Sequence, residues 1–338
     1  MQLLVDAMND PSLWTALEAD QTPSTELGVT AETSLFRYGE DTTSLKVQAT
    51  SQALNHRLLR TLANLDWRTM DELRFWLRAN RTADGSAAKP FYLELRLASG
   101  AMSLTNPNNT WYRLLPIAQS GQWELIRLSL RDLPDAIRSA VNLLQVRCIT
   151  ALDFVCHIDD LVVVREELLN DIDQALLARL HNRLRLGNDP VPAFIAHPNQ
   201  TEPALPHIRL VQYGLQLVPD AQRSTQQKGD FTETGYSVLP ASVGYALFYE
   251  IEGRATTREV TSRLFEFILQ AFSPQGSILS NNVMHRVEFI NFAIQEELGP
   301  KRAEQLALRF KVYTRQEMGV PQKVMMPYQE VAIAAGFL

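Results

Sequence analysis

Two glutamates are the side chains whose types could support catalysis in this sequence. Glu94 and Glu124 each lie in a segment where polar and apolar residues alternate, so paired carboxylates could flank a sugar and hydrolyse its glycosidic bond. That chemistry needs carboxyl groups about 5–10 Å apart, and alternation by itself also explains both residues as the polar side of a strand. We keep a glycosidase as an alternative and predict no catalytic residues.

Metal and cofactor chemistry has little support in the residue spacing. Asp159 and Asp160 adjoin an apolar run, where adjacent side chains point to opposite faces of a strand; a turn at a strand edge is the simpler interpretation, and a calcium ligand is the alternative. Cys148 and Cys156 lack a zinc-site spacing, the six histidines form no i, i+4 pair, and no glycine-rich phosphate loop occurs. We therefore predict no metal and no cofactor.

Aromatic residues are the strongest candidates for contact with a ligand or partner. All five tryptophans precede residue 125, and Trp111, Tyr112 and Trp123 follow a segment rich in turn residues. Aromatic faces stack on sugar rings or fill protein interfaces. The alternative is that these tryptophans belong to the core of a small domain.

Composition bounds the class of protein. The chain has 338 residues, 46% of them hydrophobic and 21% charged, which predicts two globular domains. A net charge of -6 disfavours a nucleic-acid partner. No run approaches the ~18 apolar residues of a membrane span, and we expect neither a signal peptide nor membrane insertion.

The elements that would position these residues change along the chain. Strict alternation over 91–97 and 73–78 predicts many short strands, and hence an all-β jelly-roll sandwich over residues 1–165. Helical spacing of leucines over 166–186 predicts an amphipathic helix, and five prolines within 187–206 predict an extended linker. We therefore predict an amphipathic helix and a Pro-rich linker over residues 166–206.

The last region, residues 207–338, predicts a small α+β domain. Its clearest strand is Val243–Ile251, which places Tyr245 and Tyr249 on one face as candidate interface aromatics. A capping box at Thr256–Glu259 predicts a helix to about Phe272, and the polar run 220–230 predicts a loop.

Three short motifs in the first region resemble the galactose-binding-like jelly rolls, the fold of many carbohydrate-binding modules. They are Met8-Asn-Asp-Pro-Ser-Leu-Trp14, Trp123-Glu-Leu-Ile-Arg-Leu and His157-Ile-Asp-Asp-Leu-Val-Val163. The resemblance covers residues 1–165 and implies a sandwich fold, sometimes with a structural calcium near the Ile-Asp-Asp element. It makes a carbohydrate-binding protein the alternative function.

The last region resembles the tail-terminator or cap proteins of phage tails and contractile injection systems. The resemblance rests on Pro206-His-Ile-Arg-Leu, Tyr236-Ser-Val-Leu-Pro240, Ala246-Leu-Phe-Tyr-Glu-Ile251 and the helix Val260–Phe272 with the residues after it. It implies a ring-forming subunit, a hexamer in that family, that binds tail tube or sheath proteins. The function first predicted is therefore a structural cap assembled in the cytoplasm as part of a tail-like particle, with a baseplate or neck component as a variant.

Overall fold

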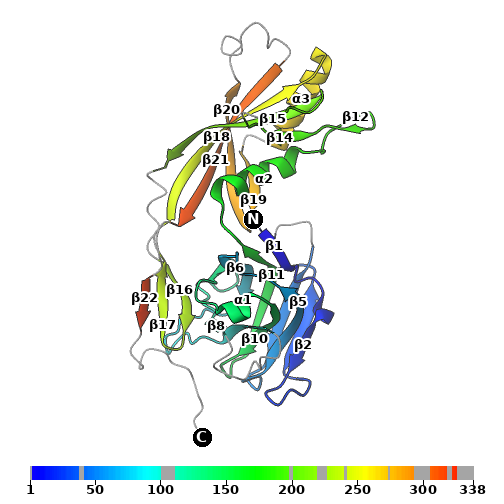
Figure 1. Ribbon diagram of the computed structural model, residues 1–338. Helices are drawn as coiled ribbons and strands as arrows, with labels where there is room; N and C mark the ends of the chain where they lie inside the picture. The colour runs from blue at the N-terminus through cyan, green and yellow to red at the C-terminus, as the bar shows by residue number, and fades with distance from the viewer. Residues whose placement is uncertain are drawn as a thin grey trace. The chain divides into compact units, whose positions relative to one another are not determined.

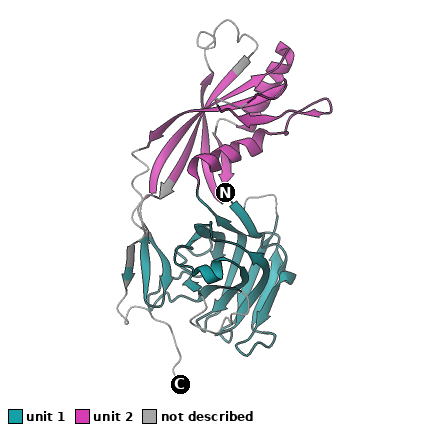
Figure 2. Ribbon diagram, viewed as in Figure 1, with its two compact units in different colours: residues 1–166, 226–239, 320–338 teal, residues 167–225, 240–319 magenta. Residues whose placement is uncertain are grey.

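The computed structural model describes residues 2–37, 42–99, 111–197, 201–218, 227–239, 242–272, 275–292, 305–317 and 322–325. The chain forms two compact units (Figure 2). Unit 1 comprises residues 1–166, 226–239 and 320–338, and unit 2 comprises residues 167–225 and 240–319.

Unit 1 is a β-sandwich with two sheets (Figure 1). The first sheet has the order β3 (Leu27–Glu32), β4 (Ser44–Ala49), β11 (Phe154–Val164), β6 (Glu72–Ala79) and β9 (Trp123–Ser129), with β1 (Gln2–Asp6) paired to β11. The second sheet has the order β2 (Trp14–Leu17), β5 (Arg57–Leu65), β10 (Val141–Cys148), β7 (Leu93–Ser99), β8 (Trp111–Leu114), β16 (Gln227–Thr232), β17 (Gly235–Leu239) and β22 (Gln322–Met325). Two short helical segments, η1 (Pro11–Leu13) and α1 (Asp135–Arg138), lie in the connections.

The core of unit 1 follows from the alternation seen in the sequence. On β7, Leu95 and Leu97 point inward, and each lies opposite a residue of β10, Val146 and Leu144 respectively. Residues directly opposite in an antiparallel pair share a face, so these side chains form one continuous apolar layer. The mostly β character agrees with the predicted jelly roll.

The hairpin β16–β17 and strand β22 were not predicted in this sandwich. All three strands were predicted to belong to the last domain, residues 207–338, with residues 220–230 as a polar loop. Phe231 instead lies opposite Leu114 of β8 and packs its ring 5.2 Å from Phe91 and 5.8 Å from Tyr236, measured between ring centroids. These aromatic contacts, the hydrogen bond from the Ser129 amide to Asp230 and the Arg113–Asp230 ion pair join the hairpin to the sandwich. The polar sequence of the segment does not reveal them.

Unit 2 is a six-stranded sheet with two helices. The order is β14 (Ala193–Ile195), β15 (His207–Leu217), β18 (Ser242–Arg254), β21 (Gln305–Glu317), β20 (Val283–Phe292) and β19 (Gln275–Ser280). The β14–β15 pair is parallel, and the other four pairs among these strands are antiparallel. The helices are α2 (Leu168–Leu180) and α3 (Arg258–Ala271), and a small hairpin joins β12 (Arg185–Leu186) to β13 (Asp189–Pro190).

Both helices pack on one face of this sheet. Leu176 of α2 and Ile268 of α3 are fully buried against a layer that includes Tyr249, Ile251 and Phe310 of the sheet. The N-terminus of α3 is capped by Thr257, whose hydroxyl accepts a hydrogen bond from the Val260 amide. The predicted capping motif therefore acts one residue later than expected.

The predicted helix and linker need correction at their junction. Helix α2 ends at Leu180, not at residue 186, and the following residues form the β12–β13 hairpin, in which Gly187 takes a positive φ of 68°. Val191 and Ala193 of the Pro-rich segment are buried in the core of unit 2. Residues Ala193–Ile195 of this segment form strand β14, so the first part of the predicted linker contributes a strand and core residues to unit 2.

The other face of the sheet in unit 2 carries polar and aromatic residues. Tyr213 lies 5.9 Å from Phe248, between ring centroids, and the Arg309 guanidinium lies 5.5 Å from the Tyr213 ring. Lys311, opposite Phe248, and Glu250, opposite Arg309, share this face. No helix of the described residues packs there.

We expect Gly253→Ala to destabilise unit 2. A Cβ at Gly253 of β18 would lie 2.7 Å from the Leu264 Cβ of α3, so the helix must shift away from the sheet. Overpacking of this kind costs about 1–3 kcal/mol. Urea unfolding followed by circular dichroism measures it, with Gly28→Ala as the control because a Cβ there meets nothing within 4 Å; equal stability of the two variants would contradict the close helix–sheet approach.

Both thiols are expected to be unreactive in the folded protein. Cys148 and Cys156 are unpaired and buried, and burial raises the pKa of Cys148 to about 12 and raises that of Cys156 as well. At pH 8 only about one Cys148 in 10⁴ is then a thiolate, the reactive form. Titration with Ellman's reagent should detect no fast thiol before denaturant is added and two afterwards; a fast native equivalent would contradict their burial.

Within the part of the chain that the structure describes, no helix has the length and apolar content needed to cross a membrane.

Candidate functional site

The strongest candidate site is the outward side of the second sheet of unit 1. Across strands β5, β10, β7 and β8, one row of opposed residues runs Leu59, Gln145, Arg96, Tyr112. The adjacent row runs Arg57, Arg147, Glu94, Leu114. Directly opposed residues share a face, and the alternate residues of these strands form the core. Leu114 is buried. We call the other seven residues of the two rows the polar face of unit 1: Arg57, Leu59, Glu94, Arg96, Tyr112, Gln145 and Arg147.

Glu94 holds the centre of the polar face together. Its side chain is only 1% exposed, and its carboxylate accepts a hydrogen bond from Arg96 Nε. The Arg147 Nη1 lies 3.8 Å from the same carboxylate oxygen, while Arg147 Nη2 donates to the Asn55 side-chain oxygen at 2.5 Å. Charge-assisted bonds of this kind fix the guanidinium planes.

Gln145 is a buried polar residue on this face. It is 1% exposed, and its Nε2 amide has no hydrogen-bond partner among the described residues. A buried amide donor without a partner costs about 1–3 kcal/mol. Native proteins satisfy nearly all such groups with protein, water or ligand atoms, so this donor marks a position where a ligand acceptor would be favourable.

The polar face has an excess of positive charge. Burial, together with the neighbouring guanidinium groups of Arg147 and Arg96, lowers the pKa of Arg57 from its ordinary value. Three arginines oppose the single carboxylate of Glu94, with Glu233 in the β16–β17 turn beside Tyr112 at the margin. Even with Glu233 included, positive charge exceeds negative charge by one.

The predicted ligand aromatics of unit 1 differ in their accessibility. Tyr112 is half-buried on the polar face, and the Arg96 guanidinium lies 5.6 Å from its ring centre. Trp111, the preceding residue, is 5% exposed and points into the core, where its indole N–H donates to Asp132 at 3.1 Å. Trp123 is half-buried in β9 of the first sheet, edge-on to His157.

The structure therefore separates the three residues that the sequence grouped. Only Tyr112 lies among the polar groups of the candidate site, and burial leaves Trp111 no face for stacking on a ligand. Trp123 belongs to the other sheet. Arg57, Gln145 and Arg147 were not singled out, and their polarity at alternate positions of strands was the available signal.

The predicted interface aromatics of unit 2 also differ. Tyr249 is fully buried, and its hydroxyl donates a hydrogen bond to the Asp173 carboxylate at 2.7 Å. Tyr245 is half-buried beside Leu169 and Leu215, where α2 begins. Tyr249 is thus a core residue that anchors α2 to the sheet, and Tyr245 remains accessible for a contact.

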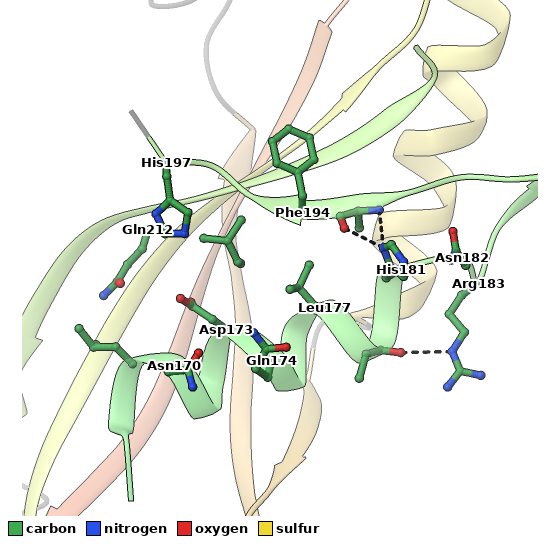
Figure 3. A pocket seen from close by; sticks show the side chains of 14 residues that line it. Asn170, Asp173, Gln174, Leu177, His181, Asn182, Arg183, Phe194, His197 and Gln212 are labelled. Carbon is green, nitrogen blue, oxygen red and sulfur yellow. Dashed lines mark hydrogen bonds between the residues drawn. The ribbon is translucent and has the colours of Figure 1, made fainter. Parts of the chain in front are cut away.

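A groove of about 1130 Å³ lies between α2 and strands β14 and β15 of unit 2 (Figure 3). Asp173, His197 and Gln212 lie toward one end, and His181 and Arg183 lie toward the other. Burial raises the pKa of Asp173. Since this carboxylate already accepts from Tyr249 and His181 is hydrogen-bonded to the Ala193 backbone, the groove presents no assembled nucleophile and base.

The carboxylates proposed for catalysis or calcium have other partners. Glu94 lies in the second sheet, whereas Glu124 lies in the first and accepts hydrogen bonds from the amides of Ala118 and Gln119. Asp159 accepts from the Arg37 amide, and Asp160 forms a bulge in β11 with φ 49°. The structure does not pair the two glutamates, and no group of three or more potential metal ligands occurs among the described residues.

Comparison with known proteins finds similarity only among solved structures. No family model matches the chain, and no curated protein does. A family 30 carbohydrate-binding module matches with 12% identity and a TM-score of 0.37, over 49% of this chain and 99% of the module. A family 11 module from Clostridium thermocellum, in complex with a β-1,3-1,4-mixed-linked tetrasaccharide, matches with 10% identity and a TM-score of 0.35, over 48% and 95%.

A third similar structure comes from a phage. The enzymatically active domain of tailspike protein 4 of bacteriophage CBA120 matches with 10% identity and a TM-score of 0.33, over 47% of this chain and 20% of the tailspike chain. The N-terminal half of the chain thus resembles carbohydrate-binding-module jelly rolls at low identity. The likeness of the last region to tail terminators stays a prediction.

Proposed function

We propose that this protein binds carbohydrate, and that it does so on the polar face of unit 1. The observation that carries the proposal is the composition of that face: a half-buried tyrosine ring continues the row that holds the Gln145 amide and the Arg96 guanidinium, and the Glu94 carboxylate lies in the adjacent row. An aromatic ring can stack on the apolar side of a sugar. The planar polar groups supply donors and acceptors for the hydroxyls of the sugar.

The proposal is tested by calorimetric titration with a panel of oligosaccharides. Tyr112→Ala and Gln145→Leu should each weaken the best ligand by about five- to hundredfold, which corresponds to ~1–3 kcal/mol for a lost buried contact. Trp123→Ala is the control, because Trp123 is a half-buried aromatic on the other sheet. Melting curves verify that all three variants remain folded.

Two outcomes would contradict this assignment. Binding lost in Trp123→Ala but unchanged in Tyr112→Ala would move the site to the first sheet. Failure of every oligosaccharide to bind the full chain would remove carbohydrate recognition as the function.

A second candidate is the structural role first predicted, a cap, baseplate or neck subunit of a tail-like particle. The observation that favours it is the face of unit 2 with Tyr213, Phe248 and Arg309, against which neither α2 nor α3 packs. Aromatic residues and arginine are enriched in protein interfaces, and a ring needs two complementary faces on each subunit.

Mass photometry and negative-stain imaging test this second candidate, with the protein alone and mixed with tail tubes. Rings, or protein density at a tube end, that disappear in Phe248→Glu would support it. A protein that stays monomeric and does not bind the tubes in the mixture would contradict the structural role.

A further inference from the structure

We propose that the ligand of the polar face is an acidic carbohydrate, whose anionic group lies between the Arg57 and Arg147 guanidinium groups and the Gln145 amide. This inference rests on the proposed carbohydrate function and adds the chemical class of the ligand. The shared chemistry is a carboxylate or sulfate oxygen attached to a sugar ring.

The sheet register brings the three groups together. Arg147 lies directly opposite Arg57 on β5, and Gln145, two residues earlier on the same side of β10, lies opposite Leu59. Neighbouring strands are about 4.8 Å apart, and side chains two residues apart on a strand share a face. Groups on adjacent strands of one face can therefore converge on one small anion.

Charge is the first reason to expect an anion. Arg57 is 8% exposed, and its Nη2 donates a hydrogen bond to a neutral acceptor, the Ala19 carbonyl oxygen, at 3.2 Å. Glu94 is shared between Arg96 and Arg147. A partly buried cluster with more guanidinium than carboxylate groups is unfavourable until an anion compensates it. Burial first, and then the charges of Arg147 and Arg96, lower the pKa of Arg57.

The Gln145 amide is the second and independent reason. Its Nε2 is buried on the outward side of β10 and has no partner among the described residues. An amide nitrogen only donates, so its complement is an acceptor oxygen. A carboxylate or sulfate oxygen satisfies both this donor and the adjacent positive charge, which a neutral hydroxyl does less well.

The tyrosine at the end of the row argues for a sugar rather than a bare ion. Tyr112 lies opposite Arg96, which in turn lies opposite Gln145, so the three residues belong to one row. A ring at this position can stack on the pyranose that carries the anionic group. A free inorganic anion would leave that aromatic surface unused.

Isothermal titration calorimetry on the full chain tests the inference with four probes of stated chemistry. They are a galacturonate hexamer, a sulfated galactan hexamer, a neutral galactan hexamer and sodium sulfate alone. We expect one of the two acidic hexamers to bind at least about tenfold tighter than the neutral one, with affinity that falls as salt is raised. Tighter binding of the galacturonate hexamer would identify a carboxylate ligand, and tighter binding of the sulfated hexamer would identify a sulfate ligand.

Variants assign the effect to the polar face. Arg147→Gln and Gln145→Leu should each weaken the acidic hexamer by about ten- to hundredfold, and Arg147→Lys should retain part of the affinity because the charge remains. The matched control is Arg131→Gln, which removes the same charge from an exposed position after β9 of the other sheet. Melting curves show whether each variant is folded, and Arg147→Lys keeps the test valid if Arg147→Gln is not.

The possible failures are distinguishable. Suppose that neutral and acidic hexamers bind with equal affinity and that Arg147→Gln changes neither affinity. The proposed preference for an acidic carbohydrate is then wrong, whereas carbohydrate binding itself stands. If no hexamer binds, or only sodium sulfate does, this inference is wrong, and the proposed function fails with it only when no oligosaccharide of the wider panel binds either. An Arg131→Gln effect as large as that of Arg147→Gln would show nonspecific attraction and would also overturn the inference.

Discussion

Replacement of Arg74 by methionine is expected to lower the free energy of unfolding of unit 1 by about 3–5 kcal/mol. The Arg74 side chain is 2% exposed and lies between two carboxylates: Nε donates to Glu72 at 2.8 Å, and Nη2 bonds to Glu166. Arg127 bonds to both carboxylates, at 3.0 and 3.1 Å. Removal of Arg74 leaves two partly buried negative charges with one guanidinium.

The ionisation of Glu72 gives this network a pH dependence. Burial opposes the charged form, but Arg74 and Arg127 outweigh it and hold the pKa of Glu72 below its ordinary value of 4.5. Because the folded pKa is depressed, the stabilisation is present above pH 4.5 and is lost as pH falls through the lower, folded value. In Arg74→Met, the acid side of the stability profile should therefore flatten.

Urea unfolding followed by tryptophan fluorescence measures both effects, because all five tryptophans lie in unit 1. The control is Arg68→Met, which breaks the well-formed but exposed Arg68–Asp66 pair at 2.6 Å and should change little. Adding Glu72→Gln to Arg74→Met should recover part of the loss, since it removes one of the stranded charges. Similar losses in both single arginine variants would contradict the buried network.

The fold was most predictable where one local pattern decided the structure. On β6 and β7, alternation in the sequence sets which side chains face the core, and Leu77 and Leu97 are buried as expected. The start of α3 was predictable within one residue because an N-cap acts over three or four positions. These signals need no knowledge of a distant segment.

The β16–β17 hairpin was not predictable because its stability is nonlocal. Residues 227–230, Gln-Lys-Gly-Asp, have no apolar alternation, and the hairpin joins the sandwich through Phe231, opposite Leu114 more than a hundred positions earlier. Asp230 also accepts a hydrogen bond from the Ser129 amide at 2.8 Å. A long-range pair of this kind leaves no periodic trace in the sequence.

The polar face was unpredictable for a related reason. Gln145 and Arg96 become neighbours only through the register of β10 with β7, and a slip of β10 by one residue would have turned Gln145 into the core. Trp111 and Tyr112 illustrate the same ambiguity. The segment Trp-Tyr-Arg-Leu has no alternation that says which aromatic faces outward, so the sequence offered both as ligand residues.

Trp111→Ala is expected to destabilise unit 1 by about 3–5 kcal/mol, the usual cost of truncating a buried tryptophan. The ring is 5% exposed, its N–H donates to Asp132, and the buried Arg113 guanidinium lies 4.4 Å from the ring centre. The substitution leaves a cavity and removes a cation–π partner of Arg113 together with the hydrogen bond. The remaining four tryptophans report the transition in urea.

Trp123→Ala is the control for the loss of stability in Trp111→Ala, because it removes a tryptophan that is only half-buried. Trp123 is half-buried, with His157 at 6.4 Å between ring centroids, so its loss should cost about 1 kcal/mol. Any sugar affinity lost in Trp111→Ala should return when binding is measured at a temperature well below its lowered unfolding midpoint. A Trp111→Ala protein that is as stable as the parent and yet binds no sugar would instead make Trp111 a ligand residue and would contradict its place in the core.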